Sequence, residues 1–253
     1  FINEPSENDS PCEHHIEAKG LTHYYDSFPA ISEISVNMCR GKITAIVGQN
    51  GSGKSTLVKH FNGLLKPDGG TLTVAGISPS GTSVAFMARK VGMVFQNPEQ
   101  MLFEESVEKE ALFGVQAVYG EIGPDDRKRV NELLKRFYLD SLTDCAPYNL
   151  SAGQKQSLAI VSALAVDPEI LVLDEPTLGF DRRRKQELTR LIGMLKEEGR
   201  TVILISHDLS LVAQTADYVL VLGNGRIRAF GPLRKVFAMR ELFEEINIPL
   251  PQV

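Results

Sequence analysis

The fold is decided by one short stretch, which reads Gly48-Gln49-Asn50-Gly51-Ser52-Gly53-Lys54-Ser55-Thr56. It fits the spacing G-x-x-x-x-G-K-[ST] of a phosphate-binding loop. The apolar run 43–47 before it and the helical pattern after it supply the strand–loop–helix context that such a loop requires. Glycines let backbone N–H groups approach a polyphosphate, and a helix that begins at about Ser55 adds the positive end of its dipole. The stretch therefore predicts a nucleoside triphosphate site.

Two side chains of this loop carry specific chemistry. Lys54 supplies a point charge for the β- and γ-phosphates, and the Ser55 hydroxyl can ligate Mg²⁺. Residues 49–56 are all expected to contact the nucleotide. The alternative interpretation is a Gly/Ser-rich turn that happens to contain a lysine.

The composition is that of an ordinary globular protein of 253 residues, with 43% hydrophobic and 23% charged side chains. The net charge of -5 argues against a nucleic-acid partner, because such surfaces are usually basic. Two basic clusters, at 127–129 and 182–185, fall in expected helices and are interpreted as solvated helix faces. No apolar run approaches the ~20 residues that cross a bilayer, and no charged-then-apolar leader begins the chain.

The three cysteines are Cys12, Cys39 and Cys145. Their number is odd, and no pair has metal-ligand or redox spacing. We therefore expect reduced thiols in a cytosolic protein.

Strand and helix patterns alternate along much of the chain, which predicts an α/β fold with a parallel sheet covered by helices. Two antiparallel strands come first, and the segment 99–167 is mainly helical. The expected strands are 16–25, 31–38, 43–47, 71–75, 91–95, 170–173, 201–205 and 218–222, with a hairpin turn at 223–225. The expected helices follow Pro124 and cover 152–166, 181–197 and 232–243.

A second chemical motif ends the apolar strand at 170–173 with two carboxylates, Asp174 and Glu175. The carboxyl ends of parallel strands form the edge where ligands bind. At that edge Asp174 can hold Mg²⁺, and Glu175 can accept the proton of an attacking water. Alone, two acids after a strand could equally be a plain helix N-terminus with favourable charges.

A third motif, Asn149-Leu150-Ser151-Ala152-Gly153-Gln154-Lys155-Gln156, resembles the signature motif of ATP-binding-cassette (ABC) ATPases. Other positions of the chain are similar to further elements of that family, in the order in which the family has them. They are the adenine-stacking aromatic at Tyr25, the glutamine Gln96, the aspartate-loop Asp181 and the switch histidine His207. The similarity runs from about Ile16 to Phe237. Tyr24 is the alternative to Tyr25, while His14, His15, His23 and His60 are interpreted as structural or exposed.

The resemblance implies a single ABC ATPase domain over 1–253. Residues 16–98 and 168–240 would form the P-loop core with an N-terminal antiparallel β subdomain. The inserted α-helical subdomain would be 99–167, between a loose leader at 1–15 and a C-terminal tail at 241–253.

The resemblance also implies a mechanism with ATP and Mg²⁺. Two cassettes pack head to tail, and the signature residues of one close over the nucleotide that the other holds. Ser151, Gly153, Gln154 and Asp181 would then bind nucleotide across the dimer. The implied catalytic residues are Lys54, Gln96, Glu175 and His207, and the implied metal ligands are Ser55, Gln96 and Asp174.

Two positions depart from the family pattern. Ala152 replaces the first glycine of Leu-Ser-Gly-Gly-Gln, which would strain the backbone if φ is positive there and is harmless if Ala152 is the first helical residue. We expect the second case. Phe180 takes a small-or-apolar slot before Asp181. Neither change removes a catalytic group, so an active ATPase is expected.

Three segments, at 94–103, 108–114 and 231–237, are similar to ATPases of energy-coupling-factor (ECF) transporters. This likeness implies vitamin or cobalt/nickel uptake at the cytoplasmic face of a membrane, with a transmembrane coupling subunit and a substrate-binding membrane protein. Met101, Leu102 and Phe103 would form a docking surface if exposed, or else cover the core of the helical subdomain. An ordinary ABC importer and a non-transport ABC protein are the alternatives. Homodimer and heterodimer both stay open.

Overall fold

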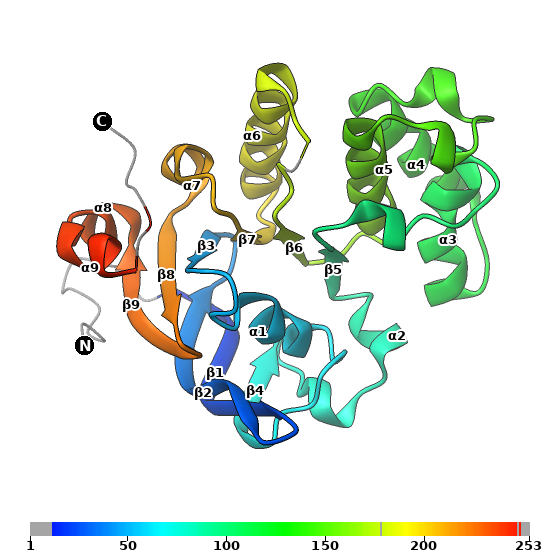
Figure 1. Cartoon of the computed structure of the whole chain (residues 1–253). Coiled ribbons are helices and arrows are strands. Elements are labelled where there is room, and N and C mark those ends of the chain that lie inside the picture. Colours follow the sequence, from blue (N-terminus) through cyan, green and yellow to red (C-terminus); the bar gives the residue numbers. More distant parts are fainter. Residues whose placement is uncertain (1–11, 178, 247, 249–253) are drawn as a thin grey trace.

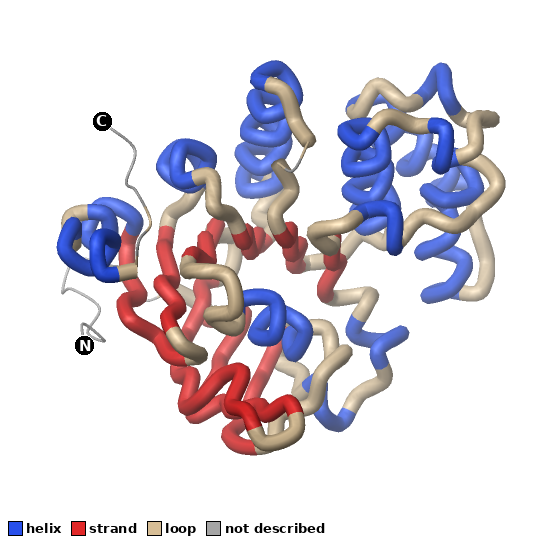
Figure 2. Tube along the Cα trace, viewed as in Figure 1, coloured by secondary structure: helices blue, strands red, loops and turns tan. Residues whose placement is uncertain are grey.

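The computed structural model describes residues 12–177, 179–246 and 248. It contains two sheets, with α1 (Lys54–Phe61) packed between them and α6 (Arg182–Glu197) and α7 (Leu209–Thr215) on the opposite face of the larger sheet (Figures 1 and 2). This is the expected α/β class, with an antiparallel sheet beside a mainly parallel one. Most of the expected leader and the end of the expected tail lie outside the described residues.

The smaller sheet is antiparallel, in the order β2-β1-β4. Its strands are β1 (His14–Tyr25), β2 (Phe28–Cys39) and β4 (Gly69–Val74). The expected strands are confirmed, but β1 starts earlier than expected, so His14 and His15 belong to the sheet and not to a leader. Alternating side chains such as Ile16 and Ala18 are buried, because one face of the sheet packs on the core.

The larger sheet has the order β5-β6-β7-β3-β8-β9, with the first five strands parallel and β9 antiparallel to β8. Its strands are β3 (Ile43–Val47), β5 (Val91–Val94), β6 (Ile170–Asp174), β7 (Thr201–Ile205), β8 (Tyr218–Gly223) and β9 (Arg226–Pro232). The five parallel strands have nearly continuous apolar runs that are buried on both faces, whereas β9 has no buried residue. The hairpin turn is confirmed, because Asn224 and Gly225 both have positive φ, at 50° and 71°.

The helices are α1 (Lys54–Phe61), α2 (Val84–Met87), α3 (Val107–Tyr119), α4 (Pro124–Arg136), α5 (Ala152–Ala165), α6 (Arg182–Glu197), α7 (Leu209–Thr215), α8 (Leu233–Phe237) and α9 (Arg240–Glu245). One expected helix, 232–243, is wrong as a single element. Pro232 ends β9, where it pairs with Tyr218, and Met239 adopts a non-helical ψ that separates α8 from α9.

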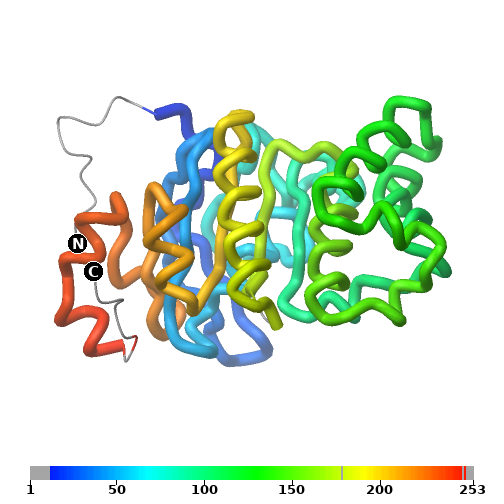
Figure 3. The backbone as a smooth tube through the Cα atoms, turned by 90° about the horizontal axis from the view of Figure 1, so that it is seen from above, coloured from blue at the N-terminus to red at the C-terminus, as the bar shows by residue number. Residues whose placement is uncertain are grey.

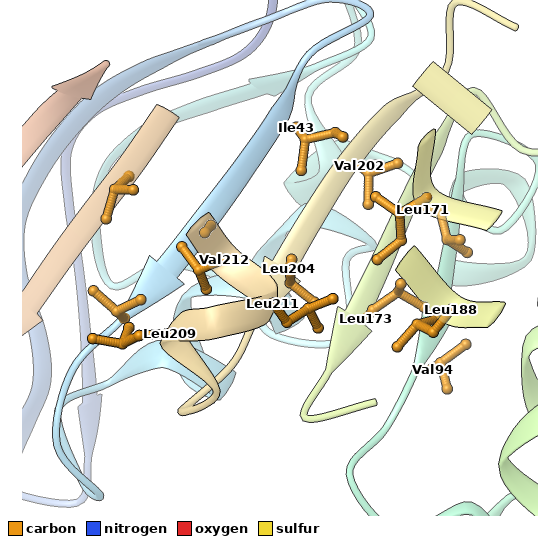
Figure 4. Close-up of a cluster of buried hydrophobic side chains, with 14 of the residues drawn as sticks. Ile43, Val94, Leu171, Leu173, Leu188, Val202, Leu204, Leu209, Leu211 and Val212 are labelled. Atoms are coloured by element: carbon orange, nitrogen blue, oxygen red, sulfur yellow. The ribbon is translucent and has the colours of Figure 1, made fainter. Parts of the chain in front are cut away.

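Three hydrophobic clusters hold these layers together. The first lies between one face of the larger sheet and α6 and α7, where residues such as Leu173, Leu188 and Val212 meet (Figure 4). The second fills the space between the two sheets and includes α1. The third joins α3, α4 and α5. Seen from above, these three helices and the pair α8–α9 lie at opposite ends of the molecule (Figure 3).

The cysteine expectation is wrong for one pair. Cys12 and Cys39 form a disulfide with their Cα atoms 5.7 Å apart, while Cys145 is a free thiol. Spacing along the chain could not show this, because the antiparallel pairing of β1 with β2 places His14 opposite Cys39. Within the part of the chain that is described, no helix has the length and hydropathy needed to cross a bilayer.

The disulfide predicts the thiol content of the purified protein. Denatured without reductant and alkylated, the chain should carry one label, on Cys145, and yield a linked peptide containing Cys12 and Cys39. After reduction it should carry three labels. Peptide mass spectrometry measures both, and three labels in the unreduced sample would contradict the pairing.

Candidate functional site

The phosphate loop leaves β3 and enters α1 at the carboxyl edge of the larger sheet. Two glycines are required there by close contacts. A Cβ on Gly48 would lie 2.3 Å from the Leu222 carbonyl oxygen, and one on Gly53 would lie 2.6 Å from that of Ala30. Gly53 also has φ 97° as the N-cap of α1, a conformation that favours glycine. Glycine at these two positions lets the loop lie close to the neighbouring backbone, because any side chain there would collide with it.

Lys54 closes over this loop. Its Nζ donates to the carbonyl oxygens of Gly48 and Gln49 at 2.8 and 2.9 Å. Burial lowers the pKa of the lysine, and the nearby carboxylates Glu175 and Asp174 oppose that shift. The ammonium group is therefore already desolvated at the place where an anion would bind.

The remaining loop residues present polar groups around Lys54. Gln49, Asn50 and Gly51 are exposed, while the buried Ser52 Oγ has no hydrogen-bond partner among the described residues. Buried polar atoms are normally paired, so an unpaired hydroxyl beside backbone N–H groups fits a site for phosphate oxygens.

Asp174 lies at the end of β6, next to the first turn of α1. Its Oδ2 accepts a hydrogen bond from Ser55 Oγ at 2.8 Å, and burial raises the pKa of its carboxyl group. A hydroxyl and a carboxylate side by side are oxygen donors of the kind that Mg²⁺ prefers. No group of three or more His, Cys, Asp or Glu residues with metal-binding geometry occurs in the described segments. The donor set fits Mg²⁺, which commonly uses one or two carboxylates together with substrate phosphates.

Glu175 is held in an unusual backbone conformation, with φ 50°. Its N–H donates to the Ile205 carbonyl oxygen at 2.9 Å, and its Oε2 accepts from the His207 N–H at 3.2 Å. The other carboxylate oxygen, Oε1, is buried without a hydrogen bond and lies 3.3 Å from His207 Nε2. Burial raises the pKa of Glu175, which suits a group that accepts a proton near neutral pH.

His207 follows β7 and joins the phosphate loop to Glu175. Its Nε2 is 3.0 Å from Asn50 Oδ1, a contact that nothing in the sequence pattern indicated. Burial lowers the pKa of His207, and the charge of Lys54 lowers it further. The structure thus brings Lys54, Ser55, Asp174, Glu175 and His207 together.

Gln96 and Tyr25 lie at the margin of this cluster. Gln96 is exposed and follows β5, the neighbour of β6, so it lies at the same sheet edge as Asp174. Tyr25 ends β1 and is 47% exposed, against 46% for Tyr24, so exposure does not separate the two candidates. The Tyr25 ring makes an edge contact with His23 at 4.9 Å, and His23 makes another with His60 of α1 at 4.9 Å. That chain of rings connects Tyr25 to the helix of the phosphate loop.

The signature residues begin α5. Ser151 is its N-cap and forms a capping box with Gln154, whose Oε1 accepts from the Ser151 N–H at 2.9 Å. Ala152 is the first helical residue and has no positive φ, so the expectation of an unstrained alanine is confirmed. The side chains of α6 pack on the face of the sheet opposite α1, and α5 lies beside α6 (Figure 1).

Asp181 caps α6, and its Oδ1 accepts from the Arg184 N–H at 2.8 Å. Phe180 is partly buried and packs against the cluster under α6, so this departure covers the core. A cleft of about 660 Å³ opens between α4, α5 and α6, with Gln154, Asp181 and Arg184 among its lining residues.

The fold and the site together define a P-loop nucleotide-binding protein of the ATP-binding-cassette class. Comparison with known proteins agrees: the family described as "ABC transporter" matches residues 31–178. The chain belongs to the ABC transporter ATP-binding family and is an ATPase.

Two relatives show how far the similarity extends. One, from Pyrococcus abyssi, bears the general name of ABC transporter ATP-binding protein and is 44% identical over 88% of this chain and 86% of its own length. The energy-coupling factor transporter ATP-binding protein EcfA2 of Acetivibrio thermocellus is 39% identical over 94% of this chain and 87% of its own.

Two solved structures are similar throughout. CbiO1 of Clostridium perfringens, described as part of the ABC transporter complex CbiONQ, has a TM-score of 0.80 at 36% identity, covering 94% of this chain and 96% of that one. A dimeric ATP-binding cassette in a post-hydrolysis state with ADP and Pi has a TM-score of 0.80 at 27% identity, covering 87% and 99%.

Glu175→Gln tests the electrostatics of the site without nucleotide. The pKa of Glu175 is raised in the folded state, so folding favours the protonated carboxylic acid over the carboxylate. The stability that the protonated side chain contributes is therefore lost as the pH rises through that pKa. At pH 8 the variant should melt about 2–4 °C higher, a shift of roughly 1 kcal/mol for a chain of this size. The gain should shrink toward the unfolded pKa of about 4.3. Calorimetry across pH measures it.

The matched control is Glu132→Gln, which neutralises an exposed carboxylate on α4. It should leave the melting temperature unchanged. Equal shifts in the two variants, or no shift at pH 8 for Glu175→Gln, would contradict the assignment.

Proposed function

We propose that the chain is the ATP-hydrolysing subunit of an ECF-type importer for vitamins or for cobalt or nickel ions, and that it works as a cassette dimer. The observation that supports catalysis best is the meeting of Lys54, Asp174, Glu175 and His207 at one sheet edge. Residues 49–56 bind the phosphates of ATP, and Tyr25 stacks on its adenine.

Within this site Glu175 is the general base. Its raised pKa and unpaired Oε1 leave it able to accept a proton from the attacking water. His207 orients the γ-phosphate and is itself oriented by Asn50 and Glu175. Lys54 stabilises negative charge as the terminal bond breaks.

Ser55 and Asp174 hold Mg²⁺ in this proposal, with Gln96 completing the ligands. When bound, Mg²⁺ supplies positive charge that neutralises the phosphate oxygens. The hydrogen bond between Ser55 and Asp174 places both oxygens for that role before nucleotide arrives.

The second half of each site comes from a second subunit, either another copy or a sister ATPase. Ser151, Gly153 and Gln154 then cover the nucleotide held by the partner's loop, and the N-terminus of α5 points its dipole at the γ-phosphate. Asp181 lies beside them. The dimeric cassette found with ADP and Pi supports this arrangement by analogy.

The dimer is tested with Glu175→Gln. The variant should bind ATP normally, because the carboxylate does not hold phosphate, but turnover should fall by about a hundredfold or more for loss of a general base. MgATP should convert it to a stable dimer. Analytical ultracentrifugation and phosphate release measure the two effects. Lys54→Ala should remain monomeric, and undiminished turnover in Glu175→Gln would refute the role of Glu175.

The ECF subtype rests on the region after Gln96. Met101 and Leu102 are partly buried against the core clusters, so for them the interpretation as core residues holds. Phe103 is 64% exposed and makes an edge contact with Phe113 at 4.6 Å. Buried Glu110 fixes this loop by accepting 2.8 Å bonds from the N–H groups of Phe103 and Glu104. A rigid, exposed aromatic pair suits a helix of a transmembrane coupling subunit.

The location of the subunit follows from this docking. We place it as a peripheral protein on the cytoplasmic face of the membrane, with a substrate-binding membrane protein in the same complex. The helical subdomain 99–167 carries the docking pair, and its own hydrophobic cluster supports treating it as a unit. The remaining boundaries proposed are those of the core, 16–98 and 168–240. No nucleic-acid partner is expected for a chain of net charge -5.

Capture from membranes tests the docking. The protein should co-purify with a small transmembrane coupling protein, and Phe103→Ser should reduce that capture by about tenfold while leaving basal ATPase activity intact. Tyr138→Asn is the control, because it removes an exposed aromatic elsewhere at a position with φ 57° that asparagine tolerates. Quantitative mass spectrometry of the captured proteins gives the result.

Equal loss of capture in the two variants would contradict a specific surface at Phe103. Capture of permease subunits with no coupling protein would favour the second candidate, an ordinary ABC importer. Its support is the general name of the Pyrococcus abyssi relative.

A further inference from the structure

Arg184 lies in the basic cluster 182–185, which the sequence suggested was a solvated helix face. The structure places its side chain differently. A Cβ on Gly153 would lie 2.7, 2.8 and 2.9 Å from Nη1, Cδ and Cζ of Arg184. The arginine side chain therefore packs directly on the first turn of α5, in the space that the signature glycine leaves open.

The same residue also holds the aspartate loop. The Arg184 N–H donates to Asp181 Oδ1 at 2.8 Å, so one residue contacts Gly153 with its side chain and Asp181 with its backbone. A second contact joins these elements, because a Cβ on Gly179 would lie 3.5 Å from the Ala152 Cβ. The N-termini of α5 and α6 are thus packed together within one subunit.

Within the described part of the chain, the Arg184 guanidinium group has no carboxylate partner. Asp181 and Glu187 line the same cleft, but Asp181 accepts from the Arg184 backbone and Glu187 pairs with Arg183 Nε at 3.1 Å. Among the residues that the structure describes, no carboxylate oxygen lies within 4.0 Å of the Arg184 guanidinium. A cation beside a helix N-terminus is repelled by the positive end of the helix dipole. An anion bound at that terminus would attract the cation, so the net interaction would become favourable.

We propose that Arg184 is a positioning residue for the ATPase dimer: it fixes the signature turn against the aspartate loop and adds positive charge behind the N-terminus of α5. This rests on the proposed function, because the anion that the positive charge attracts is the γ-phosphate held by the second subunit. Arg184 itself touches neither ATP nor the attacking water. It acts through Gly153 and Asp181.

The test uses Glu175→Gln as the parent, which accumulates the dimer. Arg184→Met keeps the aliphatic stem and removes the charge, whereas Arg184→Lys keeps the charge. Arg190→Met is the matched control, since it removes one cation from the same cleft on the same helix. Ultracentrifugation with MgATP gives the dimer dissociation constant, and nucleotide fluorescence gives the ATP affinity of the monomer.

Arg184→Met should weaken dimerisation by about tenfold, or roughly 1.4 kcal/mol, with monomer ATP affinity within about twofold. Arg184→Lys should stay within about threefold and Arg190→Met within about twofold of the parent. Parent-like dimerisation in Arg184→Met, or equal loss in Arg190→Met, would overturn the proposal. Weaker dimerisation in Arg184→Lys than in Arg184→Met would also overturn it, because packing of the side chain and not its charge would then explain the effect.

A second measurement separates this inference from the proposed function. In the nucleotide-free monomer, amide hydrogen exchange of residues 150–158 should be faster in Arg184→Ala, which removes the side-chain contact with Gly153, than in Arg190→Ala. If the parent never dimerises, the proposed dimer fails. Unchanged exchange would then overturn the positioning role as well, and faster exchange would support the contact between Arg184 and the signature turn.

Discussion

The site depends on one constraint, the parallel alignment of β6, β7 and β3 as neighbours in a buried sheet. Parallel strands end at the same edge, so the residues that follow them meet although they are far apart in the chain. Glu175 follows β6, His207 follows β7, and the phosphate loop follows β3. The backbone bond from Glu175 to Ile205 shows how closely the strand ends are joined.

This edge concentrates charge where water is scarce. Burial lowers the pKa of Lys54 and raises those of Asp174 and Glu175, so the charged form of each group is less stable than it would be in solvent. The strained φ of Glu175 adds a cost of about 1–3 kcal/mol. The surrounding apolar clusters have to offset these costs, and the phosphate groups of ATP would relieve part of them on binding.

Local patterns explain what the sequence could predict. The phosphate loop, the acidic end of β6 and the cap at Ser151 are each fixed by neighbouring residues, so their positions could be inferred without a fold. The contact of Asn50 with His207, the packing of Arg184 on Gly153 and the Cys12–Cys39 disulfide depend on which distant segments meet. The partial burial of Met101 and Leu102 could not be predicted either, because a short apolar run has the same sequence pattern in a core and on a surface.

The placement of α5 shows how packing carries the signature turn. Leu158, Val161 and Ala165 belong to the helical cluster, whereas Ile160 and Leu164 belong to the cluster on the large sheet. A helix that is apolar on both sides is buried between two cores, and its direction is fixed by both. Because Ser151 begins this helix, contacts with the helical cluster and contacts with the sheet cluster both fix the position of the signature residues. The large sheet and the helical region are therefore joined through α5, and Met101, Leu133 and Phe137 add contacts between them.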